Sequence, residues 1–137
     1  MKTKNLLPYL VGVVCLTIHL LLVEPNYLRW ATAWSTELQV VHLLATIAIH
    51  WGGWISVAIA ACTVFVERAW MTAIFPPIAI SLLHTSIAIF RTGPPPSLID
   101  GTLAATTNLV VYLAGSGVFF AAWKCIDLIS NTFNRSE

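Results

Sequence analysis

The chain has 137 residues, of which 58% are hydrophobic and 9% charged, and its mean hydropathy is +0.81. Soluble domains carry about 25% charged residues, and a 15.0 kDa chain leaves a large share of its surface exposed. This composition therefore indicates a protein whose solvent is the lipid bilayer. The net charge of +1 offers no basic surface for phosphate backbones, which excludes a nucleic-acid partner.

Four uncharged stretches are each long enough to cross the hydrocarbon core as a helix, which needs about 20 apolar residues. They predict an all-α fold in which the whole chain, 1–137, forms one integral-membrane four-helix transmembrane bundle. The predicted spans cover about 6–23, 38–66, 70–90 and 103–123.

The end of the first span is predicted from a proline. The helix should stop at Glu24 and Pro25, because proline disfavours a helical conformation in the residue before it. The segment that follows, with Arg29, Trp30 and Trp34, is amphipathic and is expected to lie along the membrane interface.

The other spans differ in length and in their breaks. The second is longer than a straight crossing requires, which predicts a tilted helix or a protruding end. Pro76 and Pro77 predict a kink in the third helix or a later start. A polar tail is expected after the fourth span, from Lys124 onward.

The basic residues predict the orientation of the bundle. Four spans place the termini and the connection between the second and third helices on one side, and that side carries five of the seven basic residues. The positive-inside rule then places both termini in the cytoplasm, in what we expect to be a bacterial inner membrane. The five are Lys2, Lys4, Arg68, Lys124 and Arg135, against Arg29 and Arg91 on the other side.

Polar side chains within the spans are the best indication of a functional site, because they are costly in lipid. His19, His42, His84 and Asn108 lie at similar depth, about 7 to 10 Å from the outer boundary by helical rise. If they point inward, they line an outward-facing pocket. Further lining residues would be His50, Thr46 and Thr85. The alternative is structural, with each side chain reaching the headgroups or bonding within the bundle.

A more specific hypothesis is b-type haem. Two neutral imidazoles on facing helices at one depth can ligate haem iron, and the hairpin of the second and third helices brings His42 and His84 level. His19 could replace either of them. The cysteines show no Cys-x-x-Cys spacing, and no other metal site is predicted.

Glycines on the second and fourth helices predict close helix packing. Gly52 and Gly53, beside two tryptophans, permit close approach of another backbone, and Gly115 and Gly117 offer a similar surface. These surfaces are expected to face each other or a partner protein. A ligand notch with aromatic walls is the functional alternative.

Several short motifs resemble those of a group of small bacterial four-helix membrane proteins of unknown function. They are the paired glycines Gly52-Gly53, the basic residue Arg68 opening the third helix, and the connection from Arg91-Thr92-Gly93 to Asp100-Gly101. The resemblance implies the four-helix fold without supplying an activity.

No diagnostic catalytic motif occurs, so the sequence favours a protein without enzymatic activity over an enzyme that acts on a lipid-soluble substrate through His19, His42 and His84. The expected function is that of an accessory or structural subunit of a membrane complex, or of a self-associating bundle. Its partners would be the lipid bilayer and other membrane-protein subunits or copies of itself. The alternative is a membrane protein that binds haem b or a small ligand in a histidine-lined pocket toward the outer leaflet.

Overall fold

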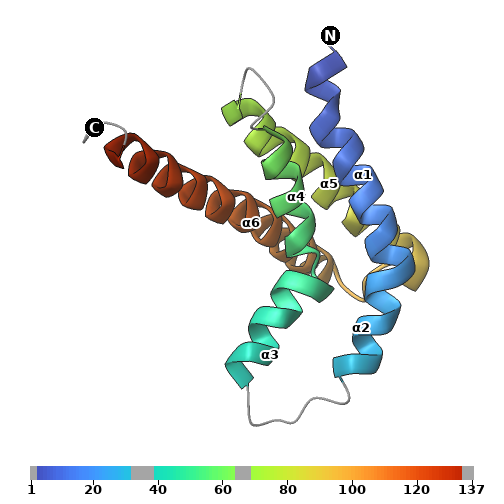
Figure 1. Cartoon of the computed structure of the whole chain (residues 1–137). Coiled ribbons are helices and arrows are strands. Elements are labelled where there is room, and N and C mark those ends of the chain that lie inside the picture. The colour runs from blue at the N-terminus through green and yellow to red at the C-terminus, as the bar shows by residue number, and fades with distance from the viewer. Residues whose placement is uncertain (1–2, 32–38, 64–68, 134–137) are drawn as a thin grey trace.

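A computed structural model of the chain describes residues 3–31, 39–63 and 69–133, which are helical apart from short connections and contain no strand (Figure 1). The all-α prediction is therefore confirmed. In chain order the helices are η1 (Thr3–Leu6), α1 (Leu7–Ile18), η2 (His19–Val23), α2 (Glu24–Ala31), α3 (Gln39–Ala45), η4 (Thr46–His50), α4 (Gly53–Thr63), α5 (Ala69–Thr92) and α6 (Leu98–Phe133).

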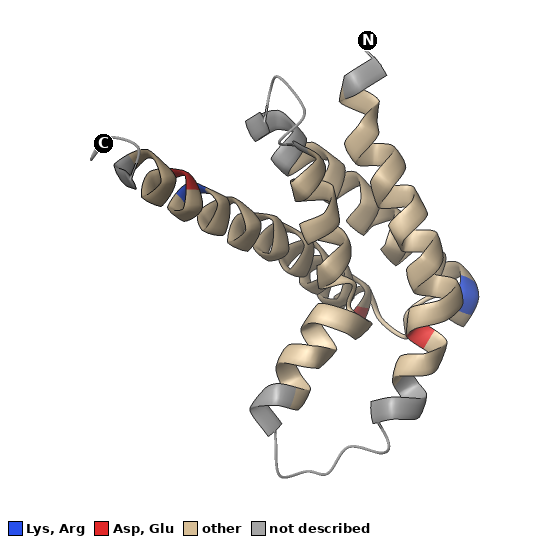
Figure 2. Cartoon of the chain, in the orientation of Figure 1, with Lys and Arg blue, Asp and Glu red and all other residues tan. Residues whose placement is uncertain are grey.

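Three stretches of helix are long and apolar enough to cross a membrane, namely Leu7–Tyr27, Ile74–Thr92 and Leu98–Asn131. A fourth, His42–His50 with Gly53–Cys62, passes the same test only if its two pieces count together. Within these stretches the charged residues fall toward the ends, at Glu24, Arg91, Asp100, Lys124 and Asp127. The rest of the described ribbon inside the stretches carries no charged residue (Figure 2). This is the distribution that a lipid environment demands.

The first helix does not stop at Pro25, so that prediction was wrong. The π-helical turn η2 leads directly into α2, and the Glu24 backbone N–H donates to the carbonyl of His19, five residues earlier. A wider turn at this point accommodates a proline, whose ring would otherwise meet the carbonyl four residues before it. The backbone of Arg29 and Trp30 continues the same helix, so no separate interface segment starts there; Trp34 lies outside the described residues.

The second span was predicted to be one tilted or protruding helix, but it consists of two helices separated by a break. Its two pieces meet at an angle of 57° across Trp51 and Gly52, and Gly52 has a φ of +74°. Glycine adopts this left-handed conformation without the steric penalty of a Cβ. The Trp51 N–H donates to the Thr46 carbonyl at 3.0 Å, which satisfies backbone groups at the break.

The third helix runs without interruption from Ala69 through Pro76 and Pro77, both of them buried, so its start is not displaced by the prolines. The left-handed Gly93, with a φ of +88°, ends it by donating its N–H to the Ile89 carbonyl at 2.9 Å.

The fourth helix is 36 residues long and continues well beyond the predicted end at residue 123. Ser97 caps its start, because its hydroxyl oxygen accepts from the Asp100 N–H at 3.1 Å and its hydroxyl donates to the Asp100 carboxylate at 2.6 Å. In the expected polar tail, Asn131 donates to Asp127 at 3.3 Å on the same helix, so these residues are helical as well.

The core lies where α1, α4, α5 and α6 meet. Its buried apolar side chains are Leu16, Ile55, Ile59, Ile80 and Tyr112. In Figure 1 the N-terminal end of α1 and the C-terminal end of α4 lie on one side of this core, and α2 and α3 lie on the opposite side. The polar residues described next gather toward the α2 and α3 side.

Candidate functional site: a polar pocket at the helix break

A cavity of about 180 Å³ opens at the break in the second span. It is bounded by the start of α2, the break itself, the end of α5 and the first turns of α6. We call it the polar pocket. Its lining residues are Glu24, His50, Trp51, His84, Ala88, Ala104 and Asn108.

His19 lies behind the wall of the polar pocket and is fully buried. The indole N–H of Trp54 donates to His19 Nδ1 at 3.3 Å. Because an indole nitrogen can only donate, Nδ1 must carry the lone pair, and a neutral His19 carries its hydrogen on Nε2. Among the described residues, Nε2 has no hydrogen-bond partner. His19 therefore presents a buried, unused donor beside the pocket.

His84 forms part of the pocket wall and connects it to the core. Its ring lies edge-on to that of His19, with 5.3 Å between the ring centroids. On its other side, His84 Nδ1 shares a hydrogen bond of 3.3 Å with the hydroxyl of Tyr112, which is fully buried. Two neighbouring aromatic groups thus fix the position of this imidazole.

His50 is held in place by contacts between α2 and the broken helix. Its ring stacks on that of Tyr27 at a centroid distance of 5.3 Å and an interplanar angle of 21°. The Thr46 hydroxyl donates to the His42 carbonyl at 2.7 Å, so in the 2.6 Å contact between Tyr27 and Thr46 the tyrosine is the donor. Among the described residues, the buried Nδ1 of His50 has no partner.

Asn108 is oriented from the opposite wall. Its amide nitrogen donates to the Thr85 hydroxyl at 3.0 Å, which joins α6 to α5. With that amide hydrogen used on Thr85, the Asn108 carbonyl oxygen is available as an acceptor at the pocket wall.

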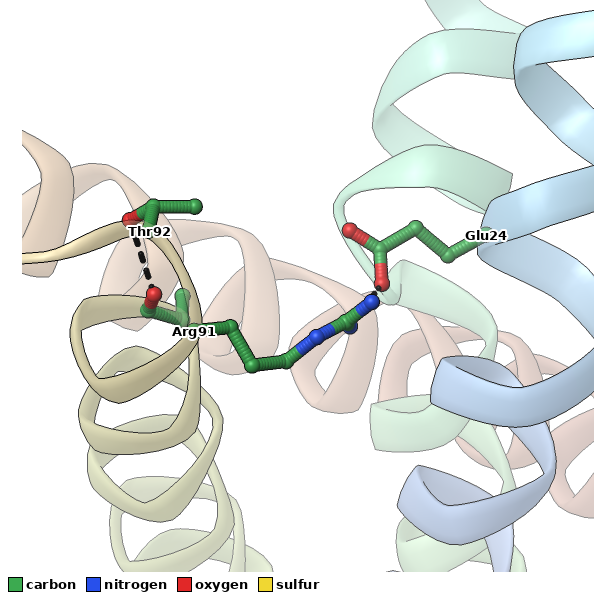
Figure 3. A network of polar contacts seen from close by, with 4 residues as sticks. Glu24, Arg91 and Thr92 are labelled. Atoms are coloured by element: carbon green, nitrogen blue, oxygen red, sulfur yellow. Dashed lines mark hydrogen bonds and ion pairs between the residues drawn. The ribbon is translucent and has the colours of Figure 1, made fainter.

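An ion pair lies at the outer edge of the pocket. The guanidinium of Arg91 donates to Oε2 of Glu24 at 2.9 Å, which connects the end of α5 to the start of α2 (Figure 3). The two side chains are 50% and 29% exposed, so this pair lies at the surface. The neighbouring Thr92 donates to the Ala88 carbonyl at 2.8 Å and completes the last turn of α5.

The helices become more apolar away from the polar pocket. Besides the two histidines and Thr85, the buried polar side chains among the described residues are Ser56, Ser81 and Ser116. Further along the same helices the core is apolar, with Ile59 and Ile80 buried next to the position of Gly12, where a Cβ would lie 2.6 Å from Ile80. The core next to the polar pocket therefore changes from polar to apolar along these helices.

The predicted site residues are distributed as follows. His50, His84 and Asn108 line the polar pocket. His19 and Thr85 contact His84 and Asn108, and the Thr46 carbonyl accepts from the N–H of the lining residue Trp51. His42 lies on α3, before the break, with its side chain partly buried.

Sequence reasoning missed Tyr27 and Tyr112, which help to orient the histidines, and it assigned Trp54 to a packing surface or a ligand notch and not to His19. Helical spacing contains a signal for Tyr112, which follows Asn108 by four residues on α6 and so lies on the same helix face. Glu24 was interpreted mainly as a charge at a helix end.

His19 and His84 do not flank a gap of the size of a haem. Their rings meet edge to face with 5.3 Å between the centroids, which leaves no room for a flat macrocycle between them. The described ring neighbours of His84 are His19 and Tyr112. Ligation by His42 and His84 stays a prediction. No group of three or more metal-binding side chains occurs in the part of the chain that the structure describes.

The four predicted packing glycines have different surroundings. A Cβ on Gly115 would collide with Ser56 and lie 2.9 Å from the Gly53 carbonyl, so α4 and α6 approach closely there. Gly52 forms the break, whereas a Cβ on Gly117 would meet nothing within 4 Å. Beside this contact lies an almost wholly apolar groove of about 420 Å³, which we call the apolar groove; its lining includes Ile47, Val57, Ala114 and Val118.

No family model, curated protein or solved structure matches the chain. The class of protein is therefore defined by the described residues alone. They form a helical protein with three helices able to cross a membrane, or four if the broken pair is one span, and with a polar pocket at one end.

Proposed function

We propose that this chain is a four-span integral membrane protein that binds a small polar solute in the polar pocket. The observation that carries the proposal is that each of the four spans contributes at least one polar side chain to the polar pocket or to the residues behind its wall. These residues are His19 and Glu24 from the first span, His50 from the second, His84 from the third and Asn108 from the fourth.

The energetics of burial support a binding role. A buried polar atom without a partner costs about 1–3 kcal/mol. Three such atoms occur among the described residues: His19 Nε2 and His50 Nδ1 near the polar pocket, and Ser81 Oγ, on a residue that does not line it. Polar groups kept in this state inside a membrane helix bundle are typical of a site that a ligand or water completes. The aromatic contacts that fix both rings hold the site in position before the ligand arrives.

The orientation follows from the distribution of basic residues. We propose that both termini lie in the cytoplasm of a bacterial inner membrane, so that the polar pocket opens toward the outer face. Cysteine accessibility in intact cells tests this: a single cysteine introduced at Ser97 should react with an impermeant maleimide in a variant whose three native cysteines are replaced by serine. Protection of that cysteine, with labelling only after lysis, would reverse the orientation.

Binding to purified protein tests the function. Three small solutes of similar size, propylammonium, propionate and propionamide, sample positive, negative and neutral charge. Calorimetric titration into protein in lipid nanodiscs should show saturable binding of at least one of them. In Ala104→Phe, which places a ring in the pocket, that binding should be lost. Leu103→Phe, at a neighbouring position 64% exposed, is the matched control and should bind normally. Absence of binding for all three solutes would overturn the proposal.

The apolar groove favours a second candidate function, that of a self-associating bundle or accessory subunit. Small residues at Ala48, Gly53, Ala114 and Gly115 allow close approach of another helix, as is common at helix interfaces in membranes. Dilution in detergent followed by light scattering tests it. A bulky substitution at Ala114 should shift an oligomer to monomer, and a wild-type protein that is monomeric at all concentrations would remove self-association.

A further inference from the structure

The charge of the polar pocket limits what it can bind. Among its seven lining residues, Glu24 is the single carboxylate and none is lysine or arginine. A carboxylate in the wall of a cavity repels anions and attracts cations, and this effect is stronger beside protein than in bulk water.

Glu24 keeps one oxygen for a ligand. Arg91 contacts Oε2 from outside the cavity, and the other carboxylate oxygen points away from the guanidinium (Figure 3). Arg91 does not line the cavity. It is 50% exposed, and a half-exposed ion pair is weak enough to be shared or displaced.

The other walls suit an organic cation. The indole of Trp51 provides aromatic surface, which attracts ammonium groups. The Asn108 carbonyl is an acceptor on the α6 side, since the amide nitrogen donates to Thr85. Ala88 and Ala104 leave apolar space for a short alkyl group.

We infer that the polar pocket binds a small organic ammonium ion, such as a primary amine with a short alkyl chain. Its ammonium hydrogens bond to Glu24 and Asn108, and its alkyl chain lies against the aromatic and alanine surface. Arg91 is then an internal competitor for the same carboxylate. This inference rests on the proposed function, because it specifies the ligand of the same pocket.

Titration with the three solutes named above distinguishes the cation inference from the proposed binding function. In nanodiscs at pH 7, propylammonium should bind at least about tenfold more tightly than propionamide, as expected for a hydrogen bond to a charged acceptor, and propionate should not bind. Glu24→Gln should lose that preference. Arg91→Gln should strengthen propylammonium binding, because the competing cation is gone.

Asp100→Asn is the matched control for Glu24→Gln. It removes a carboxylate from the same end of the molecule, but one that does not line the cavity. The side-chain oxygen of the asparagine can still accept the hydrogen bond from the Ser97 hydroxyl. Its binding should equal that of the wild type, and circular dichroism confirms that each variant is folded. If propionamide or propionate binds as tightly as propylammonium, or if Glu24→Gln keeps the preference, the cation inference is overturned while the pocket stands. If no solute binds, both are overturned.

Discussion

The break in the second span should depend on the absence of a side chain at Gly52. In Gly52→Ala the new Cβ meets two obstacles: the backbone has a φ of +74°, and the Cβ would lie 3.1 Å from both the Tyr112 hydroxyl oxygen and Ile55 Cδ1. A left-handed conformation costs an L-residue about 1–2 kcal/mol, and crowding in a close-packed core adds about 1–3 kcal/mol. We therefore expect a loss of about 2–5 kcal/mol in the free energy of unfolding.

Gly93→Ala is the matched control. Gly93 has a similar φ of +88°, but its Cβ would meet nothing within 4 Å, so only the backbone penalty of about 1–2 kcal/mol applies. Unfolding in mixed micelles with increasing dodecyl sulfate, followed by circular dichroism, measures both losses. If Gly52→Ala is no more destabilising than Gly93→Ala, the contact between the break and Tyr112 is not as described, and the reasoning fails.

Three further predictions concern contacts around the pocket and the core. Tyr27→Phe keeps the stack on His50 but removes the hydrogen bond to Thr46, so the free energy of unfolding should fall by about 1 kcal/mol in the same assay; an unchanged value would mean that the bond contributes nothing. Gly115→Leu should prevent stable folding because α4 leaves no room, whereas Gly117→Leu should be tolerated, and equal expression and melting of the two would contradict this packing. Arg91→Gln should change the unfolding free energy by less than about 1 kcal/mol, which a larger shift in melting would disprove.

The sequence predicts the helices well but not their breaks. Helical spans in lipid follow from composition, because every backbone group must be satisfied internally. Pro25 was expected to end a helix, and it does not, because the preceding π-helical turn accommodates the ring. Gly52 was interpreted as a packing residue, and its left-handed conformation follows from tertiary contacts that local pattern does not show.

The residues of the polar pocket were predicted only in part. Histidine and asparagine are conspicuous within apolar spans, so His50, His84 and Asn108 were noticed from the sequence. Tyr27 and Tyr112 were not, because an aromatic residue with one polar atom is common in membrane helices. Only their neighbours in three dimensions reveal that they position the imidazoles.

The apolar core beyond the pocket has an electrical consequence. Moving one charge across the whole membrane changes its energy by about 2.3 kcal/mol per 100 mV. In the four-span arrangement that we propose, the buried apolar residues Ile59 and Ile80 lie deeper in the bundle than the polar pocket, so an ion bound in that pocket would cross only part of this field. The binding of a cation there should then depend only weakly on the membrane potential.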